Sequence, residues 1–368
     1  MDAIVLGGGL MGSATSFFLA RRGLRVRLIE RAAIGAGATV ASFGNIRRTG
    51  RYLPQMPLAH RSLALWSQLH RLLDCDVEFR ATGHLRLIFD TEALAQMRQF
   101  QFEAQNWGLE IDELTPADIR RRFPGLGPDA IAASFSPMDG SANPRLMGTA
   151  FATAAQRLGA EITDRAGPTT VTASPSGFHV TCDKGQFSAP ILINCAGAGG
   201  RAIAAQFGED VPLSVHGPQM GVTEPLPHRI VPVVGMWGAD GAYLRQVERG
   251  NIVFGGGVKR TDVGPDGFAR VDPARLEPQL RQLVRLLPQL RNVAILRQWS
   301  GAEGYLADTL PVMGASGTTA GLFHAFGFCG HGFQLGPGVG DTMAELVATG
   351  RSETPLAPFS ITRFASRP

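Results

Sequence analysis

Residues 3–12 of the chain read Ala3-Ile4-Val5-Leu6-Gly7-Gly8-Gly9-Leu10-Met11-Gly12. A short apolar run ends abruptly in glycines, after which apolar residues recur at helical spacing as far as Arg22. This pattern predicts a strand, a tight turn and a helix. A second apolar run, Val26-Arg27-Leu28-Ile29, predicts another strand and ends in Glu30.

Gly7, Gly9 and Gly12 form the pattern G-x-G-x-x-G where the first strand passes into the helix. In a dinucleotide-binding unit, one glycine makes the turn, one admits the pyrophosphate and one packs the helix onto the strand. The pyrophosphate then lies at the positive end of the helix. Glu30 is placed to bind the ribose hydroxyls, and it would repel the 2′-phosphate of NADP. The unit alone does not choose between FAD and NAD, so a plain NAD-binding module stays open.

The chain has 368 residues, which suits two domains at about 100–200 residues each. With 44% hydrophobic and 18% charged residues, it can bury a core and is not predicted to be disordered. The net charge of +4 rests mainly on scattered arginines, without a basic stripe that would indicate nucleic acid as a partner.

The four cysteines lie far apart and form no Cys-x-x-Cys pair, so neither a metal site nor a disulfide framework is predicted. This cysteine usage is typical of a reducing cytoplasm, which is the predicted location. No apolar run approaches the roughly 18 residues that a transmembrane helix needs. The first residues also lack the charged leader of a secretory signal.

Two segments far apart in the chain consist largely of small residues. Residues 31–47 follow Glu30 directly, and residues 326–337 contain several glycines. Such segments offer backbone donors and little bulk, so they can lie flat against a planar ring. After the second segment, apolar residues return at helical spacing, with Pro337 in a first helical turn and Gly350 as a stop.

Across nearly its full length, the chain resembles the D-amino-acid oxidase-like (DAO) family of FAD-dependent oxidoreductases, which includes glycine oxidase, sarcosine oxidase and the flavin subunits of opine oxidases and hydrogen cyanide synthase. The likeness is carried by the N-terminal fingerprint, residues 35–47, Asp139-Gly140-Ser141-Ala142-Asn143-Pro144, Asn194-Cys195-Ala196-Gly197-Ala198, Trp299-Ser300-Gly301, Leu310-Pro311-Val312-Met313-Gly314 and residues 327–334. The resemblance implies FAD as the cofactor. It also implies that FAD is bound without a covalent link, because the attachment position of one sarcosine oxidase falls at Gly301.

The resemblance implies a cofactor site built from both ends of the chain. The C-terminal helix would aim its first N–H groups at the pyrimidine edge of the flavin, where the helix dipole stabilises the reduced form. Cys329 is expected to be a small core residue. The residues expected to contact FAD are Gly7, Gly9, Leu10, Met11, Gly12, Glu30, Arg31, Gly37, Ala38, Thr39, Ser42, Phe43, Gly44, Asn45, Val171, Ala196, Gly197, Gly301, Gly330, His331, Gly332, Phe333 and Gln334.

The expected fold is of the α/β class with two interlocked domains. A Rossmann-like FAD-binding domain would contain residues 1–50, 139–212 and 299–368. A discontinuous substrate-binding domain with an antiparallel sheet, of α+β type, would contain residues 51–138 and 213–298. The apolar run at residues 191–194 would return the chain to the cofactor.

The expected activity is oxidation of the C–N bond of an amino acid or secondary-amine acid of opine, proline, sarcosine or glycine type. Hydride passes to the flavin N5 and the resulting imine hydrolyses, without a strong base if the amine arrives neutral. The alternative is a 2-hydroxy-acid dehydrogenase, which needs a base such as His331 or His60. A flavin subunit that works only inside a complex, with partner electron-transfer subunits, is a third expectation, and a homo-oligomer is a further possibility.

The carboxylate of such a substrate needs an anchor, and a guanidinium fork suits it well. Arg47, Arg48 and Arg51 follow the first small-residue segment, in the stretch where related sarcosine oxidases place substrate-binding arginines. A solvated surface role is the alternative for each of them.

Three further residues are candidates for orienting the substrate. Tyr243 and Arg245 share one face of a predicted strand, which matches a family strand that carries a carboxylate-binding tyrosine. A core tyrosine is the alternative. Glu303 stands where that relative has an arginine, and a carboxylate there suits a substrate with a cationic or hydrogen-bond-donating arm, as in opines derived from basic amino acids.

Overall fold

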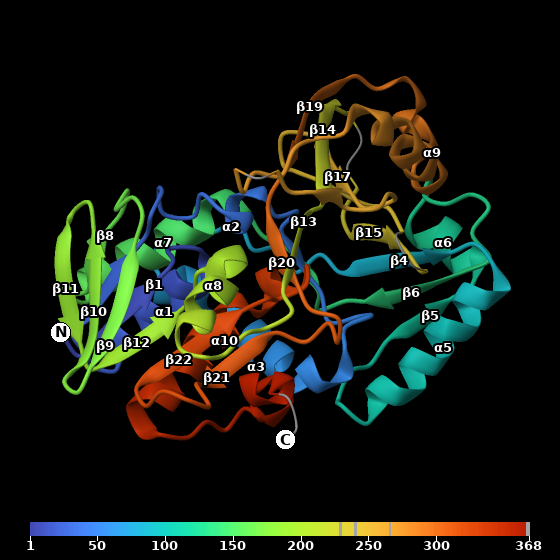
Figure 1. Ribbon diagram of the computed structural model, residues 1–368. Helices are drawn as coiled ribbons and strands as arrows, with labels where there is room; N and C mark the ends of the chain where they lie inside the picture. The colour runs from blue at the N-terminus through green and yellow to red at the C-terminus, as the bar shows by residue number, and fades with distance from the viewer. Residues whose placement is uncertain (228–229, 239–240, 265, 366–368) are drawn as a thin grey trace.

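The strand predicted at the start of the chain, β1, lies between two parallel neighbours in a six-stranded sheet, and the predicted helix packs on one face of that sheet (Figure 1). The computed structural model describes residues 1–227, 230–238, 241–264 and 266–365. Its first sheet has the strand order β21-β22-β12-β1-β2-β8, in which β21 runs antiparallel to β22. The strands are β1 (Ala3–Leu6), β2 (Val26–Ile29), β8 (Glu161–Thr163), β12 (Ile191–Asn194), β21 (Val312–Ala315) and β22 (Leu322–Phe326).

Both faces of this first sheet are covered, as is usual for parallel strands. Side chains of alternating residues pack against helices on one face and against a small antiparallel sheet on the other, so all four residues of β1 are buried. The covering elements are α1 (Leu10–Arg21), α7 (Pro144–Arg157), α10 (Gly332–Thr349), β9 (Thr170–Ser174), β10 (Gly177–Cys182) and β11 (Gly185–Ala189).

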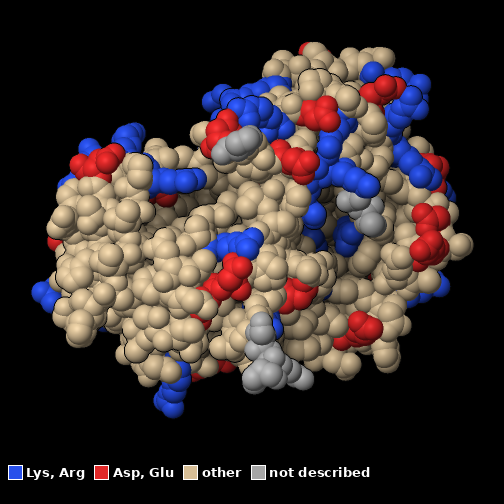
Figure 2. Space-filling view, viewed as in Figure 1, with Lys and Arg blue, Asp and Glu red and all other residues tan. Residues whose placement is uncertain are grey.

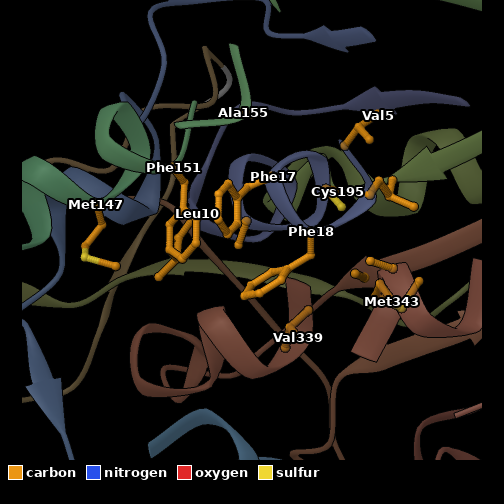
Figure 3. Close-up of a cluster of buried hydrophobic side chains, with 14 of the residues drawn as sticks. Val5, Leu10, Phe17, Phe18, Met147, Phe151, Ala155, Cys195, Val339 and Met343 are labelled. Atoms are coloured by element: carbon orange, nitrogen blue, oxygen red, sulfur yellow. The ribbon is translucent and has the colours of Figure 1, made fainter. Parts of the chain in front are cut away.

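Aromatic and aliphatic side chains fill the core between α1, α7 and α10 (Figure 3). The ring centroids of Phe17 and Phe18 on α1 lie 5.7 and 6.2 Å from that of Phe151 on α7, and 5.0 Å from each other. Val339 and Met343 of α10 are fully buried in the same core. Helix α1 is therefore surrounded by other elements on most sides.

A row of glycines on α10 faces α1. A side chain on Gly336 would collide with Leu10, and a Cβ on Gly340 would lie 2.6 Å from the main-chain carbon of Ala14. Because Gly332, Gly336 and Gly340 recur every four residues, they form a smooth stripe on one side of α10. The two helices can approach closely only because this stripe has no side chains.

Helix α10 begins at Gly332, so Pro337 lies inside the helix and not in its first turn, which corrects the prediction. A proline removes the hydrogen bond to the carbonyl four residues before it, here that of Phe333. Only one bond near the helix start is lost, and the helix continues. Gly350 ends it in the left-handed conformation at φ +76°, as predicted.

An eight-stranded sheet forms the other large part of the fold, in the order β19-β14-β17-β16-β15-β4-β6-β5. Strands β15 and β4 pair in parallel, and the other neighbours pair antiparallel. The mixed α/β fold is therefore confirmed. The strands and their helices are β4 (His84–Ile88), β5 (Asp112–Leu114), β6 (Ala132–Ser136), β14 (Gln219–Pro225), β15 (Val233–Met236), β16 (Tyr243–Gln246), β17 (Asn251–Gly255), β19 (Ile295–Ser300), α5 (Thr91–Gln105), α6 (Pro116–Arg122) and α9 (Leu276–Leu286).

The two faces of the eight-stranded sheet differ in chemistry because side chains alternate along each strand. Leu85, Leu87 and Leu244 face one side and pack with leucines of α9. His84, Arg86, Tyr243 and Arg245 alternate with these leucines and therefore lie on the opposite face. That second face carries the polar side chains of the candidate site.

Short elements connect the two large sheets. They are α2 (Ala38–Ala41), α3 (Met56–Trp66), α4 (Leu69–Leu72), α8 (Gly200–Gln206), the pair β3 (Asn45–Ile46) and β7 (Gly140–Ser141), and the small sheet of β18 (Thr261–Asp262), β13 (Ser214–Gly217) and β20 (Glu303–Tyr305). The 3₁₀ helices are Leu53–Gln55, Gly197–Gly199, Pro273–Arg275, Pro288–Asn292, Ala357–Phe359 and Ile361–Phe364.

The domain boundaries expected from the sequence remain a prediction. At two places, the packing of the chain differs from them. Leu58 and Trp66 of α3 and Leu69 of α4 are buried in the core of α1 and α10. The prediction assigned these helices to the substrate domain, whereas their side chains contact the first core. Strand β19 also extends to Ser300, past the predicted boundary at residue 299.

Gly340→Ala is expected to destabilise the protein by about 1–3 kcal/mol, because the added methyl group overlaps the main chain of α1, which cannot move aside. Thermal unfolding followed by circular dichroism measures the change. Gly199→Ala is the matched control, since its Cβ would meet no atom closer than 3.9 Å. Equal melting temperatures for the two variants would contradict the close approach of the helices.

Candidate functional site

The glycine turn between β1 and α1 has the shape of a phosphate cradle. Gly7 has a φ of +102°, and a side chain on it would collide with the carbonyl of Cys195. A side chain on Gly12 would collide with the carbonyl oxygen of Gly7. Gly9 differs, because a Cβ there would have only the Thr39 hydroxyl nearby, at 3.3 Å. The first and third glycines serve the turn itself, and the second leaves open space beside the backbone.

The N-terminus of α1 suits an anion. The N-cap residue of this helix, Gly9, has no side chain with which to cap it, and the first turn contains no acidic residue. The amide of Leu10 donates a hydrogen bond to the Thr39 Oγ1 at 2.8 Å. Free N–H groups and the helix dipole favour negative charge at such an end. The residues present therefore fit the diphosphate of a dinucleotide.

Glu30 lies beside the glycine turn, where the main chain fixes its carboxylate. Its Oε2 accepts a hydrogen bond from the amide of Gly8 at 2.6 Å, and its Oε1 accepts one from the amide of Ala32 at 2.7 Å. A carboxylate has further lone pairs, so it can still bind the hydroxyl groups of a ribose. Its neighbour Arg31 is exposed.

Two more glycines leave space at the same edge of the first sheet. A Cβ on Gly37 or on Gly197 would meet no atom within 4 Å. Gly37 precedes α2, which contains Ala38 and Thr39, and Gly197 follows Ala196 just beyond β12. Ligands of open α/β sheets bind outside the carboxyl ends of the strands, which is where these residues lie.

The N-terminus of α10 lies beside that of α1. A Cβ on Gly332 would come within 2.9 Å of the Met11 side chain. Helix α10 also lacks a side-chain cap at His331 and an acidic residue in its first turn, within the described residues. The structure thus brings together the first and last segments, as the resemblance implies, and two positive helix ends point to one region.

Phe333 and Gln334 can offer only their main chain to a cofactor. The Phe333 ring packs on Trp66 with centroids 5.6 Å apart, and the Gln334 Nε2 donates to the carbonyl of Ala59 at 2.9 Å. Both side chains therefore point toward α3. Their N–H groups are the donors that the expected contact with FAD would use, and the buried Gln334 Oε1 has no hydrogen-bond partner among the described residues.

The loop after α2 is held in place by residues from the second sheet. Arg245 donates from its Nε to the carbonyl of Phe43 at 2.8 Å, and the indole of Trp299 donates to the carbonyl of Ala41 at 3.0 Å. A side chain on Gly301 would collide with Ala41. Arg245, a candidate substrate ligand, is therefore placed as a positioning residue for this loop.

Of the other residues expected to contact FAD, Gly44 and Asn45 follow α2 closely, whereas Val171 lies in a hydrophobic core. Gly44 has a φ of +86° and donates its amide to the Ser42 Oγ at 3.2 Å. The Oδ1 of Asn45 is buried and has no hydrogen-bond partner among the described residues, so it is free to accept a bond from a ligand. Val171 is packed in the core below β2, and its backbone pairs with Val180.

Arg51 is almost completely buried, at 3% exposed, and it joins the two cofactor segments. Its guanidinium donates to the carbonyl of Arg47 at 2.9 Å, to the Gln55 Oε1 at 3.1 Å and to the carbonyl of His331 at 3.3 Å. Burial, and next the charge of Arg47, lower the pKa of Arg51 to about 9. Its donors are occupied by the protein, so Arg51 is a positioning residue.

Arg47 and Arg86 come together next to Arg51. Arg47 donates to the carbonyl of Thr49, and its Nη2 lies 3.5 Å from the His331 Nε2. Burial lowers the pKa of both guanidinium groups, and the charge of Arg47 lowers that of Arg86 further. Figure 2 shows basic side chains in a hollow of the surface close to where β4 and β15 lie in Figure 1.

Arg48 is turned away from this group. Its main-chain amide and its Nε donate to the two carboxylate oxygens of the fully buried Asp139, at 2.9 and 3.1 Å. The His60 Nδ1 lies 3.4 Å from Arg48, and the His60 Nε2 lies 2.8 Å from the carbonyl of Trp107. Arg48 and His60, both candidates for substrate chemistry, are therefore engaged in a structural network.

Glu303 forms the acidic side of the site. Its Oε2 accepts a hydrogen bond from the Tyr305 hydroxyl at 2.6 Å, and a Cβ on Gly330 would lie 3.7 Å from the same oxygen. Burial raises the pKa of Glu303, although the Tyr305 bond and the charge of Arg260 act in the opposite direction. Arg260 stacks on the Tyr305 ring at 4.0 Å.

His331 and Tyr243 lie between the basic and acidic groups. The His331 ring stacks on Tyr52, with centroids 5.2 Å apart, and burial together with the nearby arginines lowers the pKa of His331 well below its usual value. The Tyr243 ring packs edge-on against Phe43 at 4.7 Å, and burial raises its pKa. Both side chains are polar groups that are uncharged at neutral pH.

Four side chains of the site were not among the residues predicted from sequence: Arg86, Arg260, Tyr52 and Tyr305. Arg86 could have been found, because it alternates with Leu85 and Leu87 in a strand and so must face away from their core. For the other three residues, no local pattern indicates that they meet at this place.

Two buried cysteines lie next to the cofactor segments. Burial raises the pKa of the Cys195 thiol to about 12, and it also raises that of Cys329. The Cys329 sulfur accepts a hydrogen bond from the amide of Leu306 at 3.3 Å. Cys329 packs within a hydrophobic cluster, as expected of a small core residue.

None of the helices described is both long and apolar enough to cross a bilayer.

Comparison with known proteins gives a family match over nearly the whole chain. The model of the DAO family, described as FAD dependent oxidoreductase, matches residues 2–346.

Individual relatives align end to end with this chain. Sarcosine oxidase subunit beta from Arthrobacter sp is 28% identical, over 99% of this chain and 91% of the relative. Glycine oxidase from Geobacillus kaustophilus is 26% identical, over 98% of this chain and 97% of the relative. Among solved structures, L-proline dehydrogenase from P. horikoshii superposes with a TM-score of 0.91 and 29% identity, over 99% of this chain and 97% of that one.

Gly9→Val is expected to give a folded protein that purifies without yellow colour. A Cβ at Gly9 would come within 4 Å only of the Thr39 Oγ1, at 3.3 Å, so a small shift of that side chain accommodates it, but the valine fills the space that the diphosphate needs. The ratio of absorbance at the flavin band to that at 280 nm measures the loss. Gly199→Ala is the folding control, and a fully loaded Gly9→Val variant would contradict the assignment of the cradle.

Proposed function

Because this chain belongs to the DAO family of FAD-dependent oxidoreductases, we propose that it oxidises the C–N bond of an amino acid or a secondary-amine acid. The observation that carries this proposal is the group of three guanidiniums, of Arg47, Arg51 and Arg86, beside the N-terminus of α10. An FAD enzyme of this family acts on amino acids or amines, and such a site can hold the carboxylate of its substrate.

When bound, FAD would supply the acceptor for a hydride from the carbon next to the nitrogen. The substrate would lose its N–H proton as the C=N bond forms, and water would hydrolyse the imine to an amine, or ammonia, and a carbonyl compound. The protein itself positions the substrate and excludes water. Arg47 binds the carboxylate, and Tyr243 closes the wall next to the loop at Phe43.

The same residues favour an amine over a 2-hydroxy acid. Oxidation of an alcohol needs a base for the hydroxyl proton, and the candidates for it were His331 and His60. Burial, and next the charges of four nearby arginines, lower the pKa of His331, which makes it a weak base. His60 is hydrogen-bonded to Trp107 and lies next to Arg48. An amine that arrives neutral needs neither group.

We further propose that Glu303 recognises the cationic or hydrogen-bond-donating part of the substrate. It lies next to Gly330, at the start of the segment that leads into α10, and its charge and that of Arg47 both act on the pKa of Tyr243. A substrate with an anionic end and a donor arm would match these two sides of the site. Opines derived from basic amino acids have this distribution of charge.

The reduced flavin must pass its electrons either to oxygen or to partner subunits. One relative is described as a subunit beta, which supports a proposal that partner electron-transfer subunits take the electrons. If so, the reduced flavin of the isolated chain should be slow to react with oxygen. A chain that works alone as an oxidase should be reoxidised rapidly.

Anaerobic mixing of the purified holoenzyme with candidate substrates tests the proposed function. Proline, sarcosine, octopine and nopaline are compared with 2-hydroxyglutarate, and the loss of flavin absorbance is followed. At least one amine is expected to bleach the flavin, and the hydroxy acid is not. Bleaching by 2-hydroxyglutarate alone would reverse the assignment, and repeating the experiment in air separates oxidase from dehydrogenase.

Glu303→Gln is expected to lower the preference for octopine over a neutral opine built from alanine by about tenfold, since a hydrogen bond to a charged group contributes about 1.5–3 kcal/mol. In the unchanged protein, burial raises the pKa of Glu303, so the preference is present above that pKa and is lost as the pH falls through it. The ratio of kcat/KM values measured against pH checks both effects.

Glu277→Gln is the control for this measurement, because Glu277 is exposed on α9 and pairs with Arg281. It should leave the ratio and its pH dependence unchanged. An unaltered ratio in Glu303→Gln would show that Glu303 does not select the substrate.

A further inference from the structure

Resting on the proposed function, we propose that Gln55 is a positioning residue that holds the His331 ring in the tautomer with its proton on Nδ1, so that Nε2 accepts a hydrogen bond from the substrate nitrogen. His331 and Arg47 thereby recognise the two neighbouring groups of an α-amino acid, the amine and the carboxylate. A ligand without an N–H next to its carboxylate loses this bond.

The side-chain amide of Gln55 is completely buried, and two partners other than His331 set its orientation. Its Oε1 accepts a hydrogen bond from the Arg51 Nη1 at 3.1 Å, and its Nε2 donates to the carbonyl of Thr309 at 3.4 Å. The reverse orientation would place Nε2 against the Arg51 donor and Oε1 against a carbonyl oxygen, so both bonds would be lost. The Gln55 Oε1 is therefore the atom that faces Arg51.

The position of this oxygen decides which nitrogen of His331 carries the proton. The Nδ1 lies 3.4 Å from the Gln55 Oε1, and an amide oxygen can only accept, so Nδ1 is the donor. The Nε2 lies 3.5 Å from the Arg47 Nη2, and a guanidinium can only donate. Burial, and next the charges of the nearby arginines, lower the pKa of His331, so the ring carries a single proton at neutral pH. Both neighbours place that proton on Nδ1 and leave a lone pair on Nε2.

The imidazole ring of His331 is fixed in place, but its lone pair is only weakly engaged. Tyr52 stacks on the ring at an interplanar angle of 22°. The His331 amide donates to the carbonyl of Phe328 at 2.8 Å, and the His331 carbonyl accepts a hydrogen bond from Arg51 at 3.3 Å. The contact of 3.5 Å between Nε2 and Arg47 is long for a hydrogen bond. An N–H group of a ligand can therefore replace it with a shorter one.

The Arg47 Nη2 and the His331 Nε2 together match the chemistry of an α-amino acid. One atom is a donor and the other is an acceptor, and they lie side by side. An α-amino acid has a carboxylate, which accepts, and an amine, which donates, on the same carbon. When the carboxylate binds the Arg47 donor, the Nε2 lone pair is released for the amine. The opposite tautomer would present two donors, which suit a carboxylate alone.

The tautomer of His331 is measured in the holoenzyme without turnover. The protein is labelled with isotopic nitrogen in its histidines, and the chemical shifts of the ring nitrogens are recorded by NMR at neutral pH. Comparison with His331→Gln assigns the signals. The Nδ1 of His331 is expected to have the shift of a protonated ring nitrogen and Nε2 that of an unprotonated one. A protonated Nε2 would overturn the inference.

Two flat, unreactive ligands test whether the lone pair is used for binding. Pyrrole-2-carboxylate has an N–H next to its carboxylate, and furan-2-carboxylate has an oxygen in the same place. Each is titrated into the yellow holoenzyme, and the change in the flavin spectrum gives its Kd. The pyrrole is expected to bind about tenfold more tightly, because it donates to Nε2 where the furan oxygen cannot. Equal affinities, or tighter binding of the furan, would contradict the proposal.

Variants at Gln55 separate positioning of His331 from a purely structural role. Gln55→Met removes the acceptor for Nδ1 and is expected to bring the ratio of the two Kd values close to one. Gln55→Glu keeps an acceptor oxygen and should keep the preference for the pyrrole. Gln96→Met, at an exposed position on α5, is the control. If Gln55→Met weakens both ligands by the same factor, the ratio stays unchanged and the role assigned to Gln55 is wrong.

Failure of this inference can be told apart from failure of the proposed function. If proline or sarcosine bleaches the flavin under anaerobic conditions but the two ligands bind equally well, the amine oxidation stands and the acceptor role of His331 fails. If pyrrole-2-carboxylate binds more tightly but no amine bleaches the flavin, the acceptor role stands and the proposed oxidation fails.

Discussion

The contact between α1 and α10 is the constraint on which the rest of the site depends. Leu10 and Ala14 can lie against the backbone of α10 only because Gly336 and Gly340 have no side chains. This close approach sets the N-termini of both helices at one edge of the first sheet, so their positive ends act on the same ligand. Arg51, which bonds to the carbonyl of His331, then ties the substrate side of the site to α10.

The parts of the fold that depend on local pattern could be predicted from the sequence. The strand at Ala3, the glycine turn, the helix after it and the strand that ends before Glu30 all lie within thirty residues, and each has its own periodicity or turn residue. The end of α10 at Gly350 was predicted for the same reason. The start of α10 was not, because Pro337 looks like a first-turn residue although the helix already begins at Gly332.

The substrate side could be predicted only in part, because its residues come from strands that pair across long distances in the sequence. Arg47 was found through its place next to the small-residue segment, but the partner of each arginine is decided by packing. Arg48 is paired with Asp139, 91 residues away, and Arg245 bonds to Phe43, 202 residues away. Alternation with buried leucines places Arg86 and Arg245 alike on the polar face, but it does not show that Arg245 bonds to the main chain of Phe43.

The burial of Cys195 and Cys329 affects how readily this protein is oxidised by the products of flavin chemistry. Reduced flavins that meet oxygen release hydrogen peroxide, which attacks the ionised form of cysteine. Burial raises the pKa of Cys195 to about 12, so its thiol stays protonated at neutral pH. Cys75 is exposed, so oxidative damage and alkylating reagents should reach that distant surface sulfur first and spare the catalytic interior.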